Sequence, residues 1–471
     1  MKRIIVTIHL SLLSFIILAQ NLKPFGPLPS KQQMEWHNME FYLFMHFGPN
    51  TFSDLEWGHG TEDPDSFNPT QLDCRQWARI AKAAGAKGII ITAKHHDGFC
   101  LWPSKFSTHT VRESKWRNGK GDVLKELAEA CKEYGLKFGI YISPWDRNHP
   151  KYGTPEYNDV YVNTMKEAVK RYGPIFEMWW DGANGEGPNG KKQVYNFRRF
   201  EKVIRLAAPG AVVFSDIGPD IRWVGNESGI AGETNWNLLD TAGFARGAGG
   251  PSQDILNRGN VNGHNWIPAE CDVSIRPGWF YHSKEDARVK SGSELMSLYI
   301  KSVGRGANFL LNVPPDSRGL IHESDSAALM DFHHLRNELS KTNLVLHSKV
   351  DVSSNRFGYW PGSLTDGSRK SYWAPKDGQT TCSIVVDMKT PQTFNTMVLE
   401  EYIELGQRIQ SFSVEVWDGT QYQQVVGGTT IGKKRILQFA VHTSSKIRIR
   451  ITGCKATPVI GEISLYHSAI Y

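Results

Sequence analysis

Phe176–Gly185, with the sequence FEMWWDGANG, is a short apolar run that ends in Asp181 and continues into small residues. Such a run is typical of a buried strand, and the glycines after it mark a loop at its carboxyl end. A charged side chain at that point either caps the junction between the strand and the next helix or faces a cleft. The remaining sequence has to decide between these two interpretations.

Similar apolar runs recur along the chain, at residues 41–48, 88–94, 137–143, 212–216, 221–225, 267–273 and 308–313. Segments with helical apolar spacing lie between many of them, at residues 74–85, 122–134, 159–172, 194–208 and 291–303. Strands that alternate with helices across residues 20–342 predict a (β/α)₈ (TIM) barrel of the α/β class. The helices around strands five to seven are weak or missing, so we expect the barrel to be irregular there.

The pattern changes at about residue 343. Short alternating runs at residues 383–388, 395–400, 411–417, 435–441 and 446–451 are separated by turn-forming residues such as Asp-Gly and Gly-Gly. This spacing predicts an all-β, antiparallel sandwich over residues 343–471.

Composition excludes several classes of protein. The net charge of +6 is spread thinly, without a Lys/Arg block, so we expect no nucleic-acid partner. The six cysteines form no CxxC pair, and the sequence does not show which of them, if any, form disulfides. Residues 1–19 combine an early Lys-Arg pair with a short, interrupted apolar run that ends at Ala19. They predict a signal peptide with no stable membrane span, and hence export to the periplasm or the outside.

Polar side chains recur where the predicted barrel strands end. These side chains are those of His46, His95, His96, Tyr141 and Asp181, and the loop after the first strand adds Glu56 and Trp57. The carboxyl ends of barrel strands carry the chemistry of this fold, so we expect these side chains to surround one cleft. A single histidine in such a run is more often a core residue, but a series at consecutive strand ends favours a site.

Two chemistries fit this ring of side chains. Histidine and aspartate are metal ligands, which suits a metal-dependent barrel hydrolase. Against it, the first strand ends in a single histidine, and adjacent His95 and His96 would face opposite sides of a regular strand. Glycoside hydrolysis needs two carboxyl groups, with histidines that bind sugar hydroxyls as neutral donors and acceptors. A glycan-binding protein without catalysis is the third alternative.

Four motifs resemble glycoside hydrolase family 29, the α-L-fucosidases. They are FMHFG at 44–48, KHHDGF at 94–99, WWDG at 179–182 and NFLLNV at 308–313. The resemblance implies a retaining exo-hydrolase without metal or other cofactor, acting on a fucosylated oligosaccharide or glycoconjugate. Asp181 matches the family's nucleophile. The residues that match positions holding or packing near fucose are His46, Glu56, Trp57, His95, His96, Tyr141 and Trp179.

The acid/base residue varies in position within the family. Glu227, in the loop after the sixth strand, lies at the interval that we expect from Asp181, while Glu270 is the fallback and Glu233 a further candidate. In a retaining enzyme the correct residue should lie about 5–5.5 Å from the nucleophile.

Two stretches refine the expected substrate. DGANG at 181–185 and IPAECDVSIRPGWF at 267–280 resemble the subfamily that acts on α-1,3/1,4-fucosyl branches of Lewis-type glycans. Arg276 and Trp279, in the second stretch, are expected to line the site. Residues 406–450 resemble discoidin-like sandwiches, for which we expect a supporting role beside the barrel.

Overall fold

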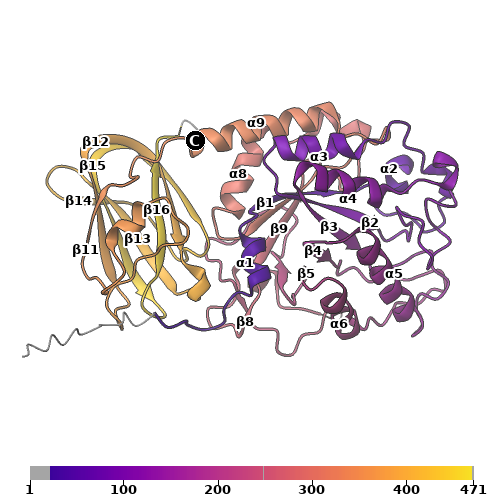
Figure 1. Ribbon diagram of the computed structural model, residues 1–471, viewed down its shortest axis with the longest axis horizontal. Helices are drawn as coiled ribbons and strands as arrows, with labels where there is room; N and C mark the ends of the chain where they lie inside the picture. The colour runs from indigo at the N-terminus through magenta and orange to yellow at the C-terminus, as the bar shows by residue number, and fades with distance from the viewer. Residues whose placement is uncertain (1–21, 248, 469–471) are drawn as a thin grey trace, which may run out of the picture.

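Eight parallel strands close into a barrel in the order β1-β10-β9-β6-β5-β4-β3-β2. The computed structural model describes residues 22–247 and 249–468, and Figure 1 shows the barrel beside an all-β unit. The predicted signal peptide, residues 1–19, lies outside the described residues. The barrel strands are β1 (Phe41–Met45), β2 (Gly88–Lys94), β3 (Lys137–Ile142), β4 (Glu177–Trp179), β5 (Val212–Ser215), β6 (Ile221–Trp223), β9 (Ala269–Ser274) and β10 (Asn308–Asn312). The predicted barrel is confirmed.

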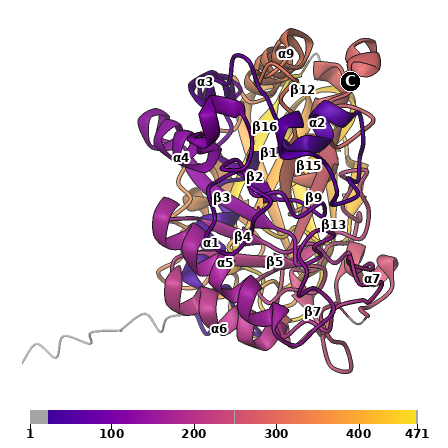
Figure 2. The same cartoon turned by 90° about the vertical axis from the view of Figure 1, so that its right-hand side faces the viewer.

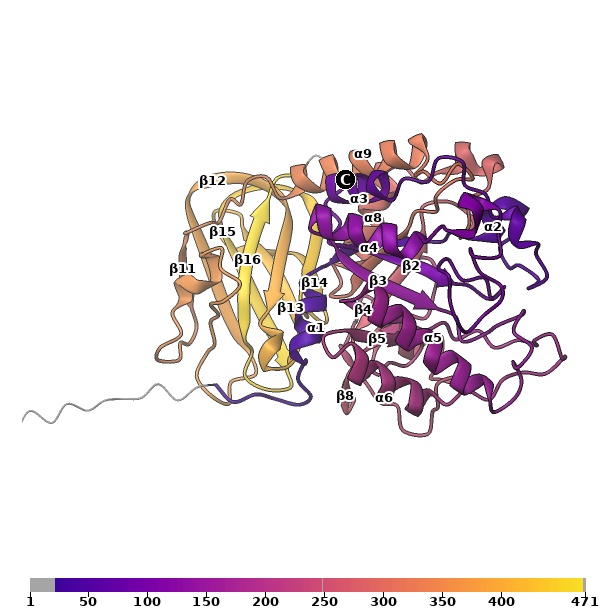
Figure 3. The same ribbon diagram turned by 45° about the vertical axis from the view of Figure 1, so that its right-hand side comes forward.

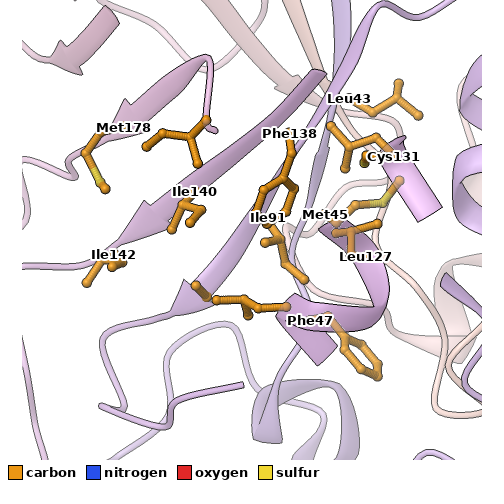
Figure 4. Close-up of a cluster of buried hydrophobic side chains, with 14 of the residues drawn as sticks. Leu43, Met45, Phe47, Ile91, Leu127, Cys131, Phe138, Ile140, Ile142 and Met178 are labelled. Atoms are coloured by element: carbon orange, nitrogen blue, oxygen red, sulfur yellow. The ribbon is translucent and has the colours of Figure 1, made fainter. Parts of the chain in front are cut away.

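Successive side chains of each strand alternate between two separate cores. On β1, Leu43 and Met45 pack outward against the helices, whereas Tyr42 and Phe44 belong to the cluster inside the barrel. Figure 4 shows the outward layer, in which Met45 lies close to Leu127 of α4 (Val123–Tyr134). Because side chains of a strand alternate with a period of two, a residue that continues the inward series past the strand end faces the mouth of the barrel.

Helices surround only part of the barrel. Figure 2 shows α3, α4, α5 and α6 along one side. The helices are α1 (Lys31–His37), α2 (Pro49–Ser53), α3 (Cys74–Ala83), α4, α5 (Tyr157–Tyr172), α6 (Phe197–Ala207), α7 (Gln253–Arg258), α8 (Gly292–Ser302) and α9 (Glu323–Leu339). Residues 216–220, between β5 and β6, are all described and contain no helix. After β6 come α7 and the small sheet β7–β8 (Leu238–Leu239 and Asn265–Trp266), so the barrel is irregular where the sequence predicted it.

The all-β unit has six strands, two of which are much longer than the predicted runs. Its strands are β11 (Lys349–Val352), β12 (Cys382–Glu401), β13 (Ile409–Trp417), β14 (Tyr422–Gly428), β15 (Arg435–Cys454) and β16 (Ile460–Tyr466). The predicted runs 383–388 and 395–400 are two halves of β12, and 435–441 and 446–451 are two halves of β15. Shifts of register within the β12–β15 pair let both strands bend without ending, and the halves of β12 pair with β11 and β16 respectively.

The all-β unit packs against the amino-terminal end of the barrel. Glu40, directly before β1, lies 2.6 Å from the Lys434 ammonium group and 3.3 Å from Arg369, and Tyr299 donates a hydrogen bond to it at 2.9 Å. Burial alone would raise the pKa of Glu40, but Lys434 and Arg369 outweigh this effect and lower it to about 2. In Figure 3, β2 and β3 run away from the all-β unit, so their carboxyl ends stay open.

We predict that Glu40→Gln lowers the free energy of unfolding at pH 7 by about 3 kcal/mol, the equivalent of a pKa depressed from 4.5 to about 2. Because the folded-state pKa is depressed, this contribution is present above pH 4.5 and is lost as the pH falls towards 2. Urea unfolding at a series of pH values measures it. Glu35→Gln is the control, since Glu35 is half exposed and pairs with lysines only at 3.8 and 3.9 Å. Equal stability of both variants at pH 7 would contradict the prediction.

Candidate active site

Asp181 faces a cavity at the carboxyl end of the barrel. On β4, Trp179 points inward, and Trp180, directly after the strand, packs outward, so Asp181 continues the inward series. Its Oδ1 accepts a hydrogen bond from the Ala183 backbone N–H at 2.7 Å, and its Oδ2 accepts one from the Tyr141 hydroxyl at 3.0 Å. These donors fix the carboxylate, while 26% of the side chain remains exposed. The cleft interpretation of the opening sequence therefore holds.

Three histidines surround the cavity beside Asp181. His46 follows β1, and both His95 and His96 follow β2, which ends at Lys94. The rings of His95 and His96 lie 4.1 Å apart between centroids, and His96 Nε2 lies 3.8 Å from Asp181 Oδ2. The alternation that would send adjacent histidines to opposite faces does not apply, because the strand has already ended.

Burial keeps these imidazoles neutral at ordinary pH. It lowers the pKa of His46 and His96 to about 4, and it lowers the pKa of His95 well below its usual value. Asn312 Oδ1 accepts a hydrogen bond from His46 Nδ1 at 2.8 Å, which leaves His46 Nε2 as an acceptor. Ser143 Oγ lies 2.8 Å from His96 Nδ1. Neutral imidazoles held in this way are suited to binding hydroxyl groups.

Glu56, Trp279 and Glu227 form a second wall of the cavity. Glu56 accepts a hydrogen bond from the Trp279 backbone N–H at 2.8 Å and lies 2.6 Å from His282 Nε2. The Trp279 indole N–H donates to Glu227 at 3.2 Å, and its ring lies 5.1 Å from that of His46. Glu227 is exposed, at the mouth of the cavity, where a bound ligand can reach it.

The cavity has a volume of about 200 Å³, which suits one sugar unit. Its lining combines the predicted site residues with three that the sequence did not single out: Phe44, His46, Glu56, Trp57, His95, His96, Tyr141, Trp179, Asp181, Ala183, Glu227, Asp272 and Trp279. Larger hollows of about 790 and 800 Å³ lie beside α6 and α4, but neither contains a comparable group of imidazoles and carboxylates. Of the three additional residues, only Asp272 had a signal in the sequence. It lies two residues after the candidate Glu270 and therefore on the same face of β9.

Three candidates from the sequence, Arg276, Glu233 and Glu270, do not line the cavity. Arg276 is buried and pairs with Asp325 at 2.9 Å and Asp286 at 2.8 Å, so it supports the loop after β9 rather than lining the site. Glu233 is on the surface beside Arg305, with 78% of its side chain exposed. Arg276 was expected to line the site and does not, because sequence gives the loop but not the direction of the side chain.

Glu270 lies beneath the floor of the cavity. It accepts hydrogen bonds from the Trp179 indole N–H at 2.8 Å and from the Tyr42 hydroxyl. It is fully buried beside Glu177, and burial raises its pKa to about 7. The Trp179 ring stacks on Phe214, with centroids 4.0 Å apart. Glu270 therefore holds the indole of the floor and is screened from the cavity by it.

The arrangement suits the hydrolysis of a glycosidic bond. Two carboxylates, neutral imidazoles and aromatic rings surround a hollow of one sugar's size, and glycoside hydrolysis uses a pair of carboxyl groups. Among the residues that the structure describes, no group of three or more His, Cys, Asp or Glu side chains could hold a metal ion. A metal-free reaction stays a prediction, which an unchanged rate after prolonged chelation would support. Fold and site together define a glycoside hydrolase of the barrel type.

Comparison with known proteins identifies the family. The sequence model of the α-L-fucosidase family matches residues 29–336, and the model of the NedA-like, galactose-binding domain matches residues 363–449. The chain is 44% identical over 453 residues to Alpha-L-fucosidase 1 of Arabidopsis thaliana, covering 94% of this chain and 88% of the relative. It belongs to the α-L-fucosidase family of glycoside hydrolases.

Solved structures resemble the whole chain. A glycoside hydrolase family 29 protein, SpGH29, superposes with a TM-score of 0.90 at 41% identity, covering 95% of this chain and 99% of that chain. The family 29 fucosidase of Ruminococcus gnavus in complex with fucose has a TM-score of 0.86 at 32% identity, covering 95% and 96%. Both matches extend over the barrel and the all-β unit.

We predict that fucose binding to the Asp181→Asn variant is nearly independent of pH between 5 and 8. The pKa values of His46 and His96 are about 4, so both rings stay neutral in this range and lose acceptor capacity only below it. Isothermal titration with L-fucose measures the affinity. A decline centred near pH 6.5 would mean that these rings titrate normally and would contradict the prediction.

Proposed function

We propose that the protein is a retaining, exo-acting α-L-fucosidase in which Asp181 is the nucleophile and Glu227 the general acid/base. Asp181 attacks the anomeric carbon while Glu227 protonates the leaving oxygen; Glu227 then activates the water that releases fucose. One observation carries the assignment. Asp181 and Glu227 line the same small cavity, whereas Glu270 lies beneath its floor and Glu233 is outside it.

The histidines, together with Glu56, Trp57 and Tyr141, are proposed to bind the hydroxyl groups of fucose. Their support is the neutral state of the imidazoles and the position of all six residues around the cavity. Trp179 supplies a flat apolar floor on which the less polar face of the sugar can lie. The Ruminococcus gnavus relative was solved with fucose, which fits this assignment.

The proposed substrate is an α-1,3/1,4-linked fucosyl branch of a Lewis-type glycan. The sequence resemblance in residues 181–185 and 267–280 supports this linkage, and Trp279 of the second stretch lies at the cavity. Trp57 is 54% exposed at the rim, where the sugar next to fucose could pack against it. Binding energy from that second sugar would then contribute to turnover.

Export to the periplasm or the outside is proposed from residues 1–19 alone. No helix among the described residues is long and apolar enough to cross a membrane. All six cysteines lie in the described part of the chain, where they are buried and free of disulfides. For the all-β unit we propose a supporting role, because its contacts with Glu40 lie at the barrel end opposite the cavity.

We predict that Asp181→Ala lowers turnover on every fucoside by roughly 10³–10⁵-fold, because no covalent intermediate can form. Glu227→Ala should impair glycans far more than activated aryl fucosides, and azide should restore its turnover on the latter by replacing water. Steady-state rates with both substrate types measure these effects. Glu233→Ala is the matched control from the same loop. Ordinary turnover by the Asp181 variant would refute the mechanism, and an unaffected Glu227 variant would remove the acid/base role from Glu227.

We predict faster release of fucose from Lewis-a or Lewis-x trisaccharide than from 2′-fucosyllactose. The two substrate types share fucose, so a difference in kcat/KM reports the linkage and the neighbouring sugar. Parallel incubations with detection of free fucose give the ratio. Equal or reversed rates would contradict the proposed linkage and leave the fucosidase assignment intact.

A further inference from the structure

His282 lies between two carboxylates in the loop after β9. Its Nε2 is 2.6 Å from Glu56 Oε1, and its Nδ1 forms a short hydrogen bond with Asp54. Ionised carboxylates only accept hydrogen bonds, so both ring nitrogens donate and the imidazole is a cation. Only 6% of the His282 side chain is exposed, against 60% for Asp54. The ring thus joins two loops that are more than 200 residues apart in the chain.

The contact between these loops is closely fitted. A Cβ atom on Gly278 would lie 2.5 Å from Glu56 Oε1 and 2.9 Å from His282 Cδ2, so only glycine allows the approach. Burial alone lowers the pKa of His282, but the hydrogen bonds to Asp54 and Glu56 outweigh it and raise the pKa above its usual value. The net rise in pKa and the two carboxylate contacts both favour the charged imidazole.

Glu56 transmits this bridge to the cavity wall. Besides His282, its carboxylate accepts backbone hydrogen bonds from Trp279 at 2.8 Å and from Phe280 at 3.2 Å. The Trp279 indole N–H then donates to Glu227 at 3.2 Å. A continuous series of contacts therefore leads from His282 through Glu56 and Trp279 to the exposed carboxylate at the mouth.

We propose that His282 is a positioning residue for the acid/base carboxylate: by bridging Asp54 and Glu56 it holds Trp279, and through the indole N–H it holds Glu227. The inference rests on the proposed role of Glu227. Asp181 is held by Ala183 and Tyr141, so loss of the bridge leaves the nucleophile in place. Because Glu56 and Trp279 also line the cavity, every substrate loses some binding, and poor leaving groups additionally lose protonation.

The test compares His282→Gln and His282→Phe with the wild type on aryl fucosides whose leaving groups differ in pKa. Good leaving groups need little protonation, whereas poor ones depend on a well-placed acid. We expect kcat/KM to fall about 10–100-fold for poor leaving groups and less than about 3-fold for the best, with His282→Gln the milder variant because it keeps one donor. Asp54→Asn should show the same pattern more weakly. Because Asp54 is exposed, this variant tests the bridge even if the His282 variants fold poorly.

Lys284→Ala is the matched control. Lys284 pairs with the outer side of Asp54 at 3.3 Å and is 69% exposed, so its removal should leave the leaving-group dependence unchanged. A uniform loss across leaving groups, or no loss, in the His282 and Asp54 variants would overturn the inference. Glu227→Ala is measured alongside. If this variant lacks a leaving-group dependence, the proposed acid/base role of Glu227 fails. If it shows the dependence and the His282 variants do not, only the positioning role is refuted.

Discussion

Closure of a parallel sheet sends the carboxyl ends of all eight strands to one end of the barrel, and the site depends on this constraint. Each strand contributes inward side chains at every second position. His46 after β1, Asp181 after β4 and Glu227 after β6 meet there although the chain between them is long. The all-β unit packs at the opposite end, where the ionic contacts of Glu40 hold it. The contacts that stabilise the fold and the residues of the candidate site therefore lie at opposite ends of the same strands.

Two buried carboxyl groups below the cavity, those of Glu177 and Glu270, hold the indole rings of Trp36 and Trp179. Glu177 and Glu270 are wholly buried, and their pKa values are raised by burial, so the pair is not doubly charged. Glu270 receives the indole N–H of Trp179, and Trp36 donates to Glu177 at 3.2 Å. Buried carboxyl groups are tolerated when they are hydrogen-bonded, and here they fix the indole ring in the floor of the cavity. The sequence presented Glu270 as a catalytic alternative; its depth gives it this other role.

Much of the fold was predictable because local patterns carry it. Apolar runs located all eight barrel strands, and the missing helix between β5 and β6 was visible as a gap in the periodicity. The prediction failed where tertiary contacts, and not local patterns, determine where an element begins and ends. Predicted short strands of the all-β unit fused into β12 and β15, since a bulge bends a strand without the turn residues that mark an end. The long helix α9 (Glu323–Leu339) was not predicted, and only three apolar side chains in it are buried.

The sequence by itself determined the strand ends and the identity of the polar residues there, because alternation and turn chemistry are local properties of the chain. It therefore supplied Asp181, the three histidines and the family resemblance. The interval from Asp181 favoured Glu227, but only the tertiary structure showed which carboxylate reaches the cavity, since Glu233 lies on the surface and Glu270 is buried on β9. It alone revealed Asp272 in the lining and His282 between Asp54 and Glu56. Such contacts join loops far apart in the chain, and no local pattern encodes them.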